Sequence, residues 1–416
     1  MGVIRLVVGE HSEILADRRF QLLLLANVMP PLGSALLSPV LESLIDPFGA
    51  SAANIGLMMS AFSAPAIVAI PIAGVLADRH GRRPVMVFGL LCFGIAGTAI
   101  SATTSFRVAL ALRLLQGVGF ASLTPIIITS IGDLYTGSVE ATAQGLRFTG
   151  SGLAQMGFPL AAGVLVTVAW QYPFLLYALA IPVAVVIFVW FEEPTDRDDT
   201  DAIDRELRDQ LQQLWSLVRQ RRAAAMVIAR GTPNVVWIGF LTYNSILVVD
   251  VAGGSPTQAG ILAALGSLSY AVSATQAGRI TARFDSRLWP LVAMNVTLAA
   301  GVVVVFTAAT VWIAYVGVVV MGAGFGVLLS LYRSIVTDLA PVSLRGGYVS
   351  LAEGMGRLTT TVTPVAMGAG IAVATPRIGF APSIQIVGIA TGVIAAGVGI
   401  ACLFVVSSAP LIRSTG

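Results

Sequence analysis

The feature that most constrains this chain is a series of long apolar stretches separated by short polar loops. Cut at glycine, proline and charged residues, the sequence predicts twelve helices, over residues 19–45, 53–77, 84–103, 106–132, 142–169, 171–191, 223–249, 256–282, 288–309, 311–337, 346–373 and 382–406. Each is close to the ~20 residues that cross the hydrocarbon core of a bilayer. Only 11% of the residues are charged, against roughly 25% in soluble domains. The sequence therefore predicts an all-α polytopic membrane protein without a cleavable signal peptide.

One long hydrophilic stretch divides the predicted helices into six and six. It begins acidic (EEPTDRDDTD), continues with a helical pattern (DRELRDQLQQLWSLVRQRR) and ends in arginines. We expect an N-terminal half over 1–191, a cytoplasmic linker with an interfacial helix over 192–222, and a C-terminal half over 223–416. A merely solvated linker is the alternative.

The two halves resemble each other in sequence. Shifting the chain by about 204 residues aligns small and turn residues, among them Gly74 with Gly278, Arg83 with Arg287, Gly117 with Gly322, Asp133 with Asp338, and Pro159 with Pro364. This indicates a duplication, two pseudo-symmetric halves, and a binding site between them near the middle of the membrane.

Arginine placement predicts the orientation. With both termini in the cytoplasm, only Arg107 and Arg377 fall on the outer side, while Arg113, Arg230 and Arg357 lie within helices. This follows the positive-inside rule and predicts a multi-pass protein of the cell membrane. The net charge of +3 is therefore no sign of a nucleic-acid partner.

Residues for metal or covalent chemistry are sparse. Cys92 and Cys402 lie in apolar runs without metal-like spacing, and the two histidines, His11 and His80, fall in cytoplasmic segments. No nucleophile–base arrangement emerges, so we expect no metal, no cofactor and no enzyme.

The stretch GVLADRHGRRP carries the first family resemblance. Its residues Gly74, Asp78, Arg79, Gly81, Arg82 and Arg83 resemble the loop 2–3 signature of the major facilitator superfamily. The resemblance implies a twelve-helix transporter and a cytoplasmic latch, in which Asp78 binds the N-terminal end of the helix near Gly346 in the other half. A plain positive-inside anchor would explain the arginines, but not Asp78 or the glycines.

Helix 106–132 carries a second signature, Arg113 to Gly119. Arg113 lies about 10 Å from the outer end of the helix at 1.5 Å per residue, a costly depth for an unpaired charge. In drug:proton antiporters of this superfamily, the equivalent arginine is associated with proton coupling. The alternative is an arginine that extends to the outer headgroups.

Helix 142–169 reads GSGLAQMGFPLAAG over 150–163 and partly resembles the antiporter signature of the same superfamily. Gly152, Gly157, Pro159 and Gly163 match, whereas Phe158 replaces an expected glycine. The pattern predicts a kinked, closely packed hinge helix between the halves.

In this fold the first, fourth, seventh and tenth helices line the cavity, with the second, fifth, eighth and eleventh beside them. Candidate cavity residues are Asn27, Met29, Pro30, Gln116, Gln155, Met156, Asn234, Tyr243, Asn244 and Tyr332. Apart from Arg113 the set is mostly neutral, which favours a lipophilic or weakly polar substrate. For any single methionine or tyrosine of this set, ordinary helix packing is at least as good an explanation.

Proton coupling requires a titratable group inside the membrane. The best embedded acid is Glu353, with Arg357 one turn further along the same helix. Both are coupling candidates, and a static i,i+4 ion pair is the alternative.

The sequence thus predicts a secondary transporter working by alternating access, a proton-coupled exporter of small hydrophobic or drug-like compounds. A transporter of a sugar, amino acid or other metabolite is the alternative, and a membrane-embedded enzyme or a receptor a remote one. The expected partners are the bilayer, a small-molecule substrate and protons, and the family resemblance implies a monomer.

Overall fold

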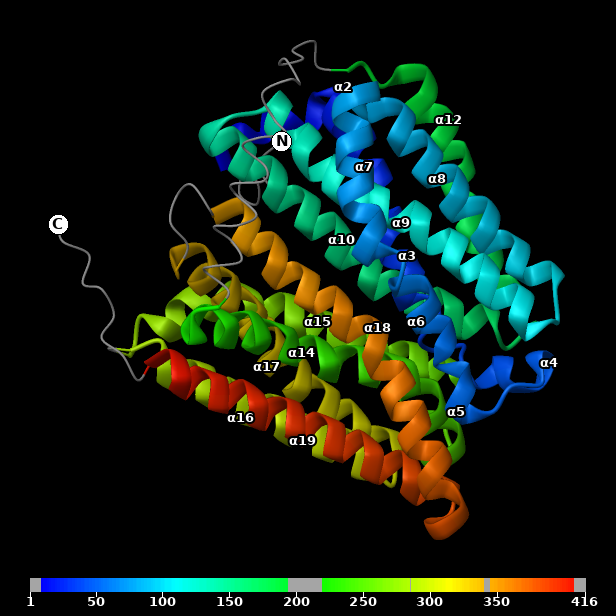
Figure 1. The fold of residues 1–416 in the computed structure, drawn as a ribbon. Helices are drawn as coiled ribbons and strands as arrows, with labels where there is room; N and C mark the ends of the chain where they lie inside the picture. Colours follow the sequence, from blue (N-terminus) through cyan, green and yellow to red (C-terminus); the bar gives the residue numbers. More distant parts are fainter. Residues whose placement is uncertain (1–8, 194–218, 285, 340–344, 408–416) are drawn as a thin grey trace. The chain divides into compact units, whose positions relative to one another are not determined.

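The computed structural model describes residues 9–193, 219–284, 286–339 and 345–407 (Figure 1). All secondary structure in these ranges is helical, and nine of the helices there are long and apolar enough to cross a membrane. The predicted all-α membrane fold is confirmed. The chain divides into two units, Met1–Arg197 with Ala259–Ala264, and Asp198–Gln258 with Leu265–Gly416. The expected interfacial helix falls on 194–218, outside the described residues.

Unit 1 contains all six predicted N-terminal helical segments. Its elements are η1 (Gly9–Ala16), α2 (Arg18–Asn27), α3 (Met29–Ala35), η2 (Glu42–Leu44), α4 (Ile45–Phe48), α5 (Ala52–Ile55), α6 (Leu57–Ser63), α7 (Ala66–His80), α8 (Arg82–Ala99), η3 (Ile100–Ala102), α9 (Phe106–Leu134), α10 (Gly137–Leu165), α11 (Tyr172–Leu175), η4 (Leu176–Leu179) and α12 (Ala180–Trp190). Helix α8 packs against both α9 and α12 (Figure 1).

Two of the predicted helices in this unit are interrupted. The segment 19–45 changes from α2 to α3 after Asn27, where Pro30 and Pro31 lack the amide hydrogens that a continuous helix needs. The segment 53–77 changes at Gly56 and again before α7, where Pro65 precedes the helix. Both segments are helical where predicted, but the interruptions after Asn27, at Gly56 and before α7 were not predicted.

Unit 2 contains longer, mostly unbroken helices. They are α14 (Arg221–Ile246), the π-helical turn η6 (Leu247–Val251), α15 (Pro256–Thr281, grouped with unit 1 over Ala259–Ala264), α16 (Leu288–Thr307), α17 (Val311–Leu339), α18 (Arg345–Ile378) and α19 (Phe380–Ser407). Helix α14 packs against α18 and α19, and α16 packs against α17 and α19.

The local geometry repeats at the offset seen in the sequence. Gly49 and Gly253 both adopt positive φ, at 56° and 66°. Two residues later in each half, Ser51 and Ser255 accept a hydrogen bond from the backbone amide three residues on and cap the next helix. The same turn therefore opens α5 in one unit and α15 in the other, which supports a duplication.

Candidate functional site

The polar stretch Gly74–Pro84 joins α7 to α8 through Gly81. This glycine has a φ of 96°, and a Cβ atom placed on it would collide with the carboxylate of Glu193. Glu193 accepts a hydrogen bond from the Arg83 amide at 3.0 Å, at the N-terminal end of α8. Glycine is therefore required here both for its backbone conformation and for room beside a capping carboxylate.

The arginines of this stretch hold unit 1 together. Arg82 forms an ion pair with Asp133 at 2.7 Å and donates a hydrogen bond to Thr129, both on α9. Arg83 donates to the carbonyl oxygen of Phe188 on α12 and lies 4.9 Å from the centre of its ring. The two arginines therefore connect the start of α8 to the ends of α9 and α12, where a positive charge is favoured.

The other predicted latch residues lie on α7 before this junction. Asp78 and Arg79 are exposed, and Gly74 is half-buried. The expected contact of Asp78 with the start of α18 would join the two units, and it stays a prediction. Sequence reasoning did not single out Glu193, although it belongs to the carboxylate pair Glu192–Glu193 directly after the sixth apolar segment.

A second contact joins α2 to the end of α9. Asp17 caps α2 by accepting from the Arg19 amide at 2.8 Å, and it accepts from the Tyr135 hydroxyl at 2.6 Å. Burial alone would raise the pKa of Asp17, but the hydrogen bonds from Tyr135 and Arg19 and the Arg19 charge lower it overall. Burial and the Asp17 carboxylate in turn raise the pKa of Tyr135.

Arg113 lies at the centre of unit 1 with none of its surface exposed. Its Nε donates to the Met58 carbonyl at 3.0 Å and its Nη2 to the Gly33 carbonyl at 2.8 Å. Its Nη1 donates to Gln116 Oε1 at 2.6 Å and to the Tyr177 hydroxyl at 3.3 Å. The guanidinium thereby joins α3, α6, α9 and η4.

The environment of Arg113 is polar but uncharged. Each hydrogen-bond partner recorded for it in the described residues is neutral, and its guanidinium carbon lies 4.4 Å from the centre of the Phe62 ring. Full burial excludes the alternative of an arginine extending to the headgroups. Sequence reasoning paired Arg113 with Gln116 as site candidates, and the structure brings these two together.

A second buried arginine of unit 1 holds α10 against α2. Arg147 donates from Nε to Gln144 at 2.9 Å and from Nη1 to Asn27 Oδ1 at 3.3 Å. The Asn27 amide donates to the Arg147 carbonyl at 2.9 Å and to the Ser151 hydroxyl at 2.8 Å. Asn27 was expected in the cavity, and the structure joins it to the buried Arg147.

Unit 2 places Glu353 between arginines of three helices. Its Oε1 accepts from Arg230 Nη2 of α14 at 2.9 Å and from Arg333 Nε of α17 at 3.1 Å. Arg357, one turn along α18, interacts electrostatically with Glu353, Arg230 and Arg333. The expected pair of Glu353 and Arg357 is thus part of a larger cluster, and its role in coupling stays a prediction.

The remaining candidate cavity residues of unit 2 are mostly packed between helices. Tyr332 is fully buried and accepts from Asn295 Nδ2 at 3.1 Å. Tyr243 and Asn244 are also buried. Asn234 is half-buried beside Gly356 of α18, where a Cβ atom would contact its amide.

The candidates on α3 and α10 are spread along their helices. Met29 is buried at the start of α3, with Pro30 next to it, and Gln155 and Met156 are half-buried on α10. Helix α10 runs unbroken through Pro159. A Cβ atom on Gly152 or Gly157 would meet no atom within 4 Å, so these glycines are not sites of close packing. The hinge role of Gly152, Gly157, Pro159 and Gly163 stays a prediction.

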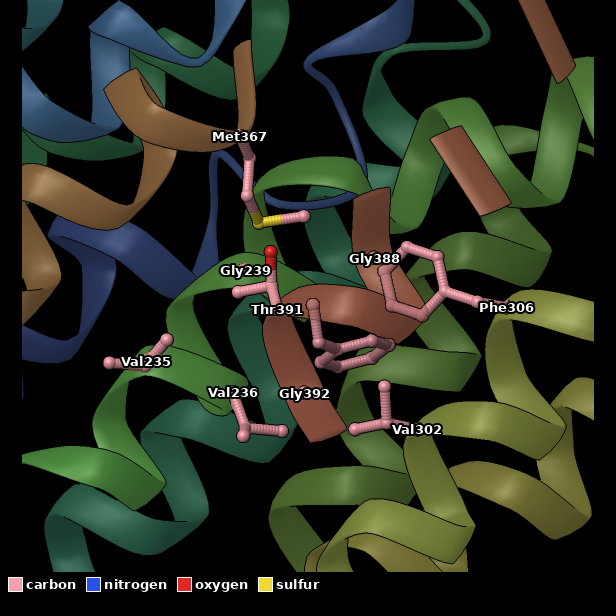
Figure 2. Close-up of a pocket in the computed structure, with 10 residues that line it drawn as sticks. Val235, Val236, Gly239, Val302, Phe306, Met367, Gly388, Thr391 and Gly392 are labelled. Carbon is pink, nitrogen blue, oxygen red and sulfur yellow. The ribbon is translucent and has the colours of Figure 1, made fainter. Parts of the chain in front are cut away.

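A small apolar recess lies where α14, α16, α18 and α19 of unit 2 meet. Figure 2 shows its lining residues, Val235, Val236, Gly239, Phe240, Val302, Phe306, Met367, Gly388, Thr391 and Gly392. The Thr391 hydroxyl is the one polar side-chain group in this lining. The recess can take an apolar group but offers no charge or hydrogen-bond pattern that would recognise a particular compound.

Sequence reasoning missed three arginines of these clusters, Arg147, Arg230 and Arg333. None of the three was named as a site candidate, and Arg230 was noted only as lying within a predicted helix. That position was a usable signal, because Arg230 directly follows the apolar run AAAMVIA. Burial at such positions requires partners.

Comparisons with known proteins agree with this architecture. The model of the Major Facilitator Superfamily matches residues 23–251 and 234–415. Among solved structures, a bacterial homolog of the human lysosomal transporter Spinster, in an inward-facing unoccupied conformation, is similar with a TM-score of 0.79 at 17% identity, over 94% of this chain and 98% of that one. The nucleoside transporter NupG is similar with a TM-score of 0.78 at 12% identity, over 93% of this chain and all of that one.

Curated relatives are transporters as well. The tetracycline resistance protein, class H, of Pasteurella multocida is 21% identical over 80% of this chain and 85% of its own length. The bacillibactin exporter of Bacillus subtilis is 34% identical over 34% of this chain, and the match spans only 37% of that exporter. The multidrug transporter MdfA of Yersinia pestis is 25% identical over 55% of each chain. The protein is therefore a multi-pass membrane transporter, not an enzyme, and belongs to the major facilitator superfamily.

Proposed function

We propose that this transporter is a proton-coupled exporter of small hydrophobic or drug-like compounds. It would act by alternating access in the cell membrane, as a monomer with both termini in the cytoplasm. The names of the relatives support the substrate class, because they include a tetracycline resistance protein and a multidrug transporter.

The observation that carries the coupling proposal is the environment of Arg113. A fully buried guanidinium with neutral partners on three other elements keeps a positive charge inside unit 1. Such a charge disfavours a second cation nearby, and a change in its hydrogen bonds would alter that effect. This is the kind of residue through which a proton and a substrate can influence each other.

The test uses the purified full-length protein in liposomes with an imposed pH gradient. We expect ethidium or tetracycline to accumulate against its concentration gradient and to leave when an ionophore collapses the pH gradient. Arg113→Gln is expected to lose the gradient dependence, whereas Arg107→Gln, at an exposed position, should transport normally. Thermal melting of both variants checks that they remain folded.

Three outcomes would contradict parts of this proposal. Transport that ignores the pH gradient would rule out proton coupling. Gradient-driven transport that persists in folded Arg113→Gln would rule out coupling through that residue. Absence of movement of both compounds would contradict the drug-like substrate class and favour a sugar, amino acid or other metabolite.

A further inference from the structure

Unit 2 carries an excess of positive charge where α14, α17 and α18 meet. Arg230, Arg333 and Arg357 come from these three helices, and Glu353 is the carboxylate that interacts with them. Arginine keeps its proton in proteins, so Arg230 and Arg333 place two fixed positive charges on one carboxylate oxygen of Glu353. We call these four side chains the arginine cluster.

The hydrogen bonds of the cluster are also incomplete. Arg230 and Arg333 both donate to the same carboxylate oxygen, Glu353 Oε1. The side chain of Arg230 is only 3% exposed, and its Nε and Nη1 are buried without a hydrogen-bond partner among the described residues. A guanidinium normally satisfies such donors with a carboxylate or phosphate held by two parallel hydrogen bonds. Arg230 therefore lacks an acceptor that an oxyanion could supply.

The cluster can be reached from outside unit 2. The side chains of Glu353 and Arg333 are 39% and 45% exposed, so the buried guanidinium of Arg230 lies behind two side chains that contact the surface. Movement of Glu353 away from Arg230 would expose donors on Arg230 and Arg333 together. An arriving anion could then accept hydrogen bonds from Arg230 and Arg333 in place of the Glu353 carboxylate.

We propose that the arginine cluster binds the anionic group of a transported compound, a carboxylate or similar oxyanion, and that Glu353 occupies its donors until that group displaces it. The transported compounds would then include lipophilic anions or zwitterions. This inference rests on the proposed export function only where it treats the bound anion as part of a transported compound. It differs from the expectation of a mostly neutral set of site residues, which included no arginine besides Arg113.

Two variants are expected to act in opposite directions. Arg230→Gln removes the incompletely paired guanidinium and should weaken anion binding. Glu353→Gln removes the competing carboxylate charge, keeps an acceptor oxygen for the arginines, and should strengthen anion binding. If Glu353 instead recruited protons or cationic substrates, Glu353→Gln would leave anion binding unchanged or weaken it.

The experiment measures binding by calorimetry, with the full-length protein in nanodiscs of phosphatidylcholine. The probes are 2-naphthoate and its neutral analogue 2-naphthamide, which differ in charge on the same ring system. We expect 2-naphthoate to bind at least about tenfold more tightly than the amide. Arg230→Gln should abolish that preference, Glu353→Gln should increase it, and Arg377→Gln, at an exposed position, should leave it unchanged. Arg230→Lys keeps the positive charge but loses the planar guanidinium, so it should retain part of the preference for 2-naphthoate. Melting curves identify any unfolded variant.

Equal binding of 2-naphthoate and 2-naphthamide to wild type would overturn the proposal, as would weaker 2-naphthoate binding in Glu353→Gln. The same anion chemistry occurs in lipid headgroups. If the naphthoate preference is absent, but phosphatidylglycerol copurifies with wild type and not with Arg230→Gln, the cluster is a lipid site and the proposal fails. Because binding needs no transport, naphthoate binding without gradient-driven movement would contradict the export function alone.

Discussion

At the scale of single residues, Arg113 shows how a charge can be kept inside a membrane protein with no counter-ion among the residues that the structure describes. Its five N–H donors leave a planar fork in several directions, and they meet acceptors on α3, α6 and the same helix, with Tyr177 alongside. Gly97 leaves the room for this arrangement, because a Cβ atom there would collide with the Gln116 amide and the Tyr177 ring. The stability of unit 1 therefore depends on the shape of the guanidinium as well as its charge.

Arg113→Lys is expected to destabilise the protein strongly although the charge is kept. A lysine ammonium has three donors on one atom and cannot reach the Gly33 and Met58 carbonyls at once, so we expect a loss on the order of 3 kcal/mol. The measurement is the melting temperature of the purified protein in detergent, with Arg107→Lys at an exposed site as control. Equal melting temperatures for the two variants would show that the fork geometry contributes little.

Residue chemistry was only partly predictable from sequence. The depth of Arg113 and its neighbour Gln116 follow from counting along one helix. The hydrogen bonds to the Gly33 and Met58 carbonyls could not be predicted, because every residue has a backbone carbonyl and the sequence does not indicate which one is used. The partner of Arg230 could not be foreseen either, because Glu353 lies 123 positions further along the chain.

At the scale of elements, glycines set how closely helices approach. A Cβ atom on Gly119 of α9 would collide with the backbone of Gly89 and Phe93 on α8. In unit 2, a Cβ atom on Gly388 or Gly392 of α19 would collide with Phe306 or Val302 of α16. Small residues at such contacts let backbones pack closely where lipid supplies no hydrophobic driving force.

Helix α19 allows a matched test of this packing. Gly392→Ala should destabilise the protein by about 1–3 kcal/mol, because Val302 and its helix must shift. Gly397→Ala, on the same helix with no atom within 4 Å of its added Cβ, should be neutral or stabilise by up to about 1 kcal/mol, since alanine favours helix. Melting temperatures in detergent compare the two. Similar effects at both positions would refute close packing as the reason for Gly392.

The positions of the helices were the most predictable part of the fold. Apolar runs fix where a helix can cross a membrane, and each predicted range has a helical counterpart in the described residues. The interruptions at Asn27 and Gly56 were not foreseen, because prolines and glycines also occur inside continuous transmembrane helices, as Pro159 and Pro233 do here.

At the scale of the whole molecule, the two units share their turns and differ in their charges. Arg82 donates to Thr129 and Arg287 donates to Ser334, and in both units the acceptor lies 47 residues after the arginine. The position equivalent to Arg113 is instead Val318, which is fully buried. Contacts that hold helix ends thus recur in both units, whereas the buried arginines do not recur at matching positions. A sequence comparison of the halves finds the residues at the helix ends, but it does not reveal the contacts of the buried arginines.

The orientation of the chain can be tested by labelling. In a variant lacking Cys92 and Cys402, single cysteines would replace exposed His80, the last residue of α7, or exposed Thr104, between η3 and α9. With cytoplasmic termini, an impermeant maleimide should label Thr104→Cys in intact cells and His80→Cys only after permeabilisation. The reverse pattern would contradict the orientation inferred from arginine placement.

The partners of Arg113 also bear on how the protein is made. Chains emerge from the ribosome N-terminus first, so α3 and α6, which carry the Gly33 and Met58 carbonyls, are synthesised before Arg113. This cation can enter the bilayer beside acceptors that are already there. Arg230 precedes Glu353 by 123 residues, so its counter-ion is translated much later. During synthesis of the second half, Arg230 is therefore present for an interval before Glu353 has been made. We expect proteins that assist membrane insertion to matter most during this interval.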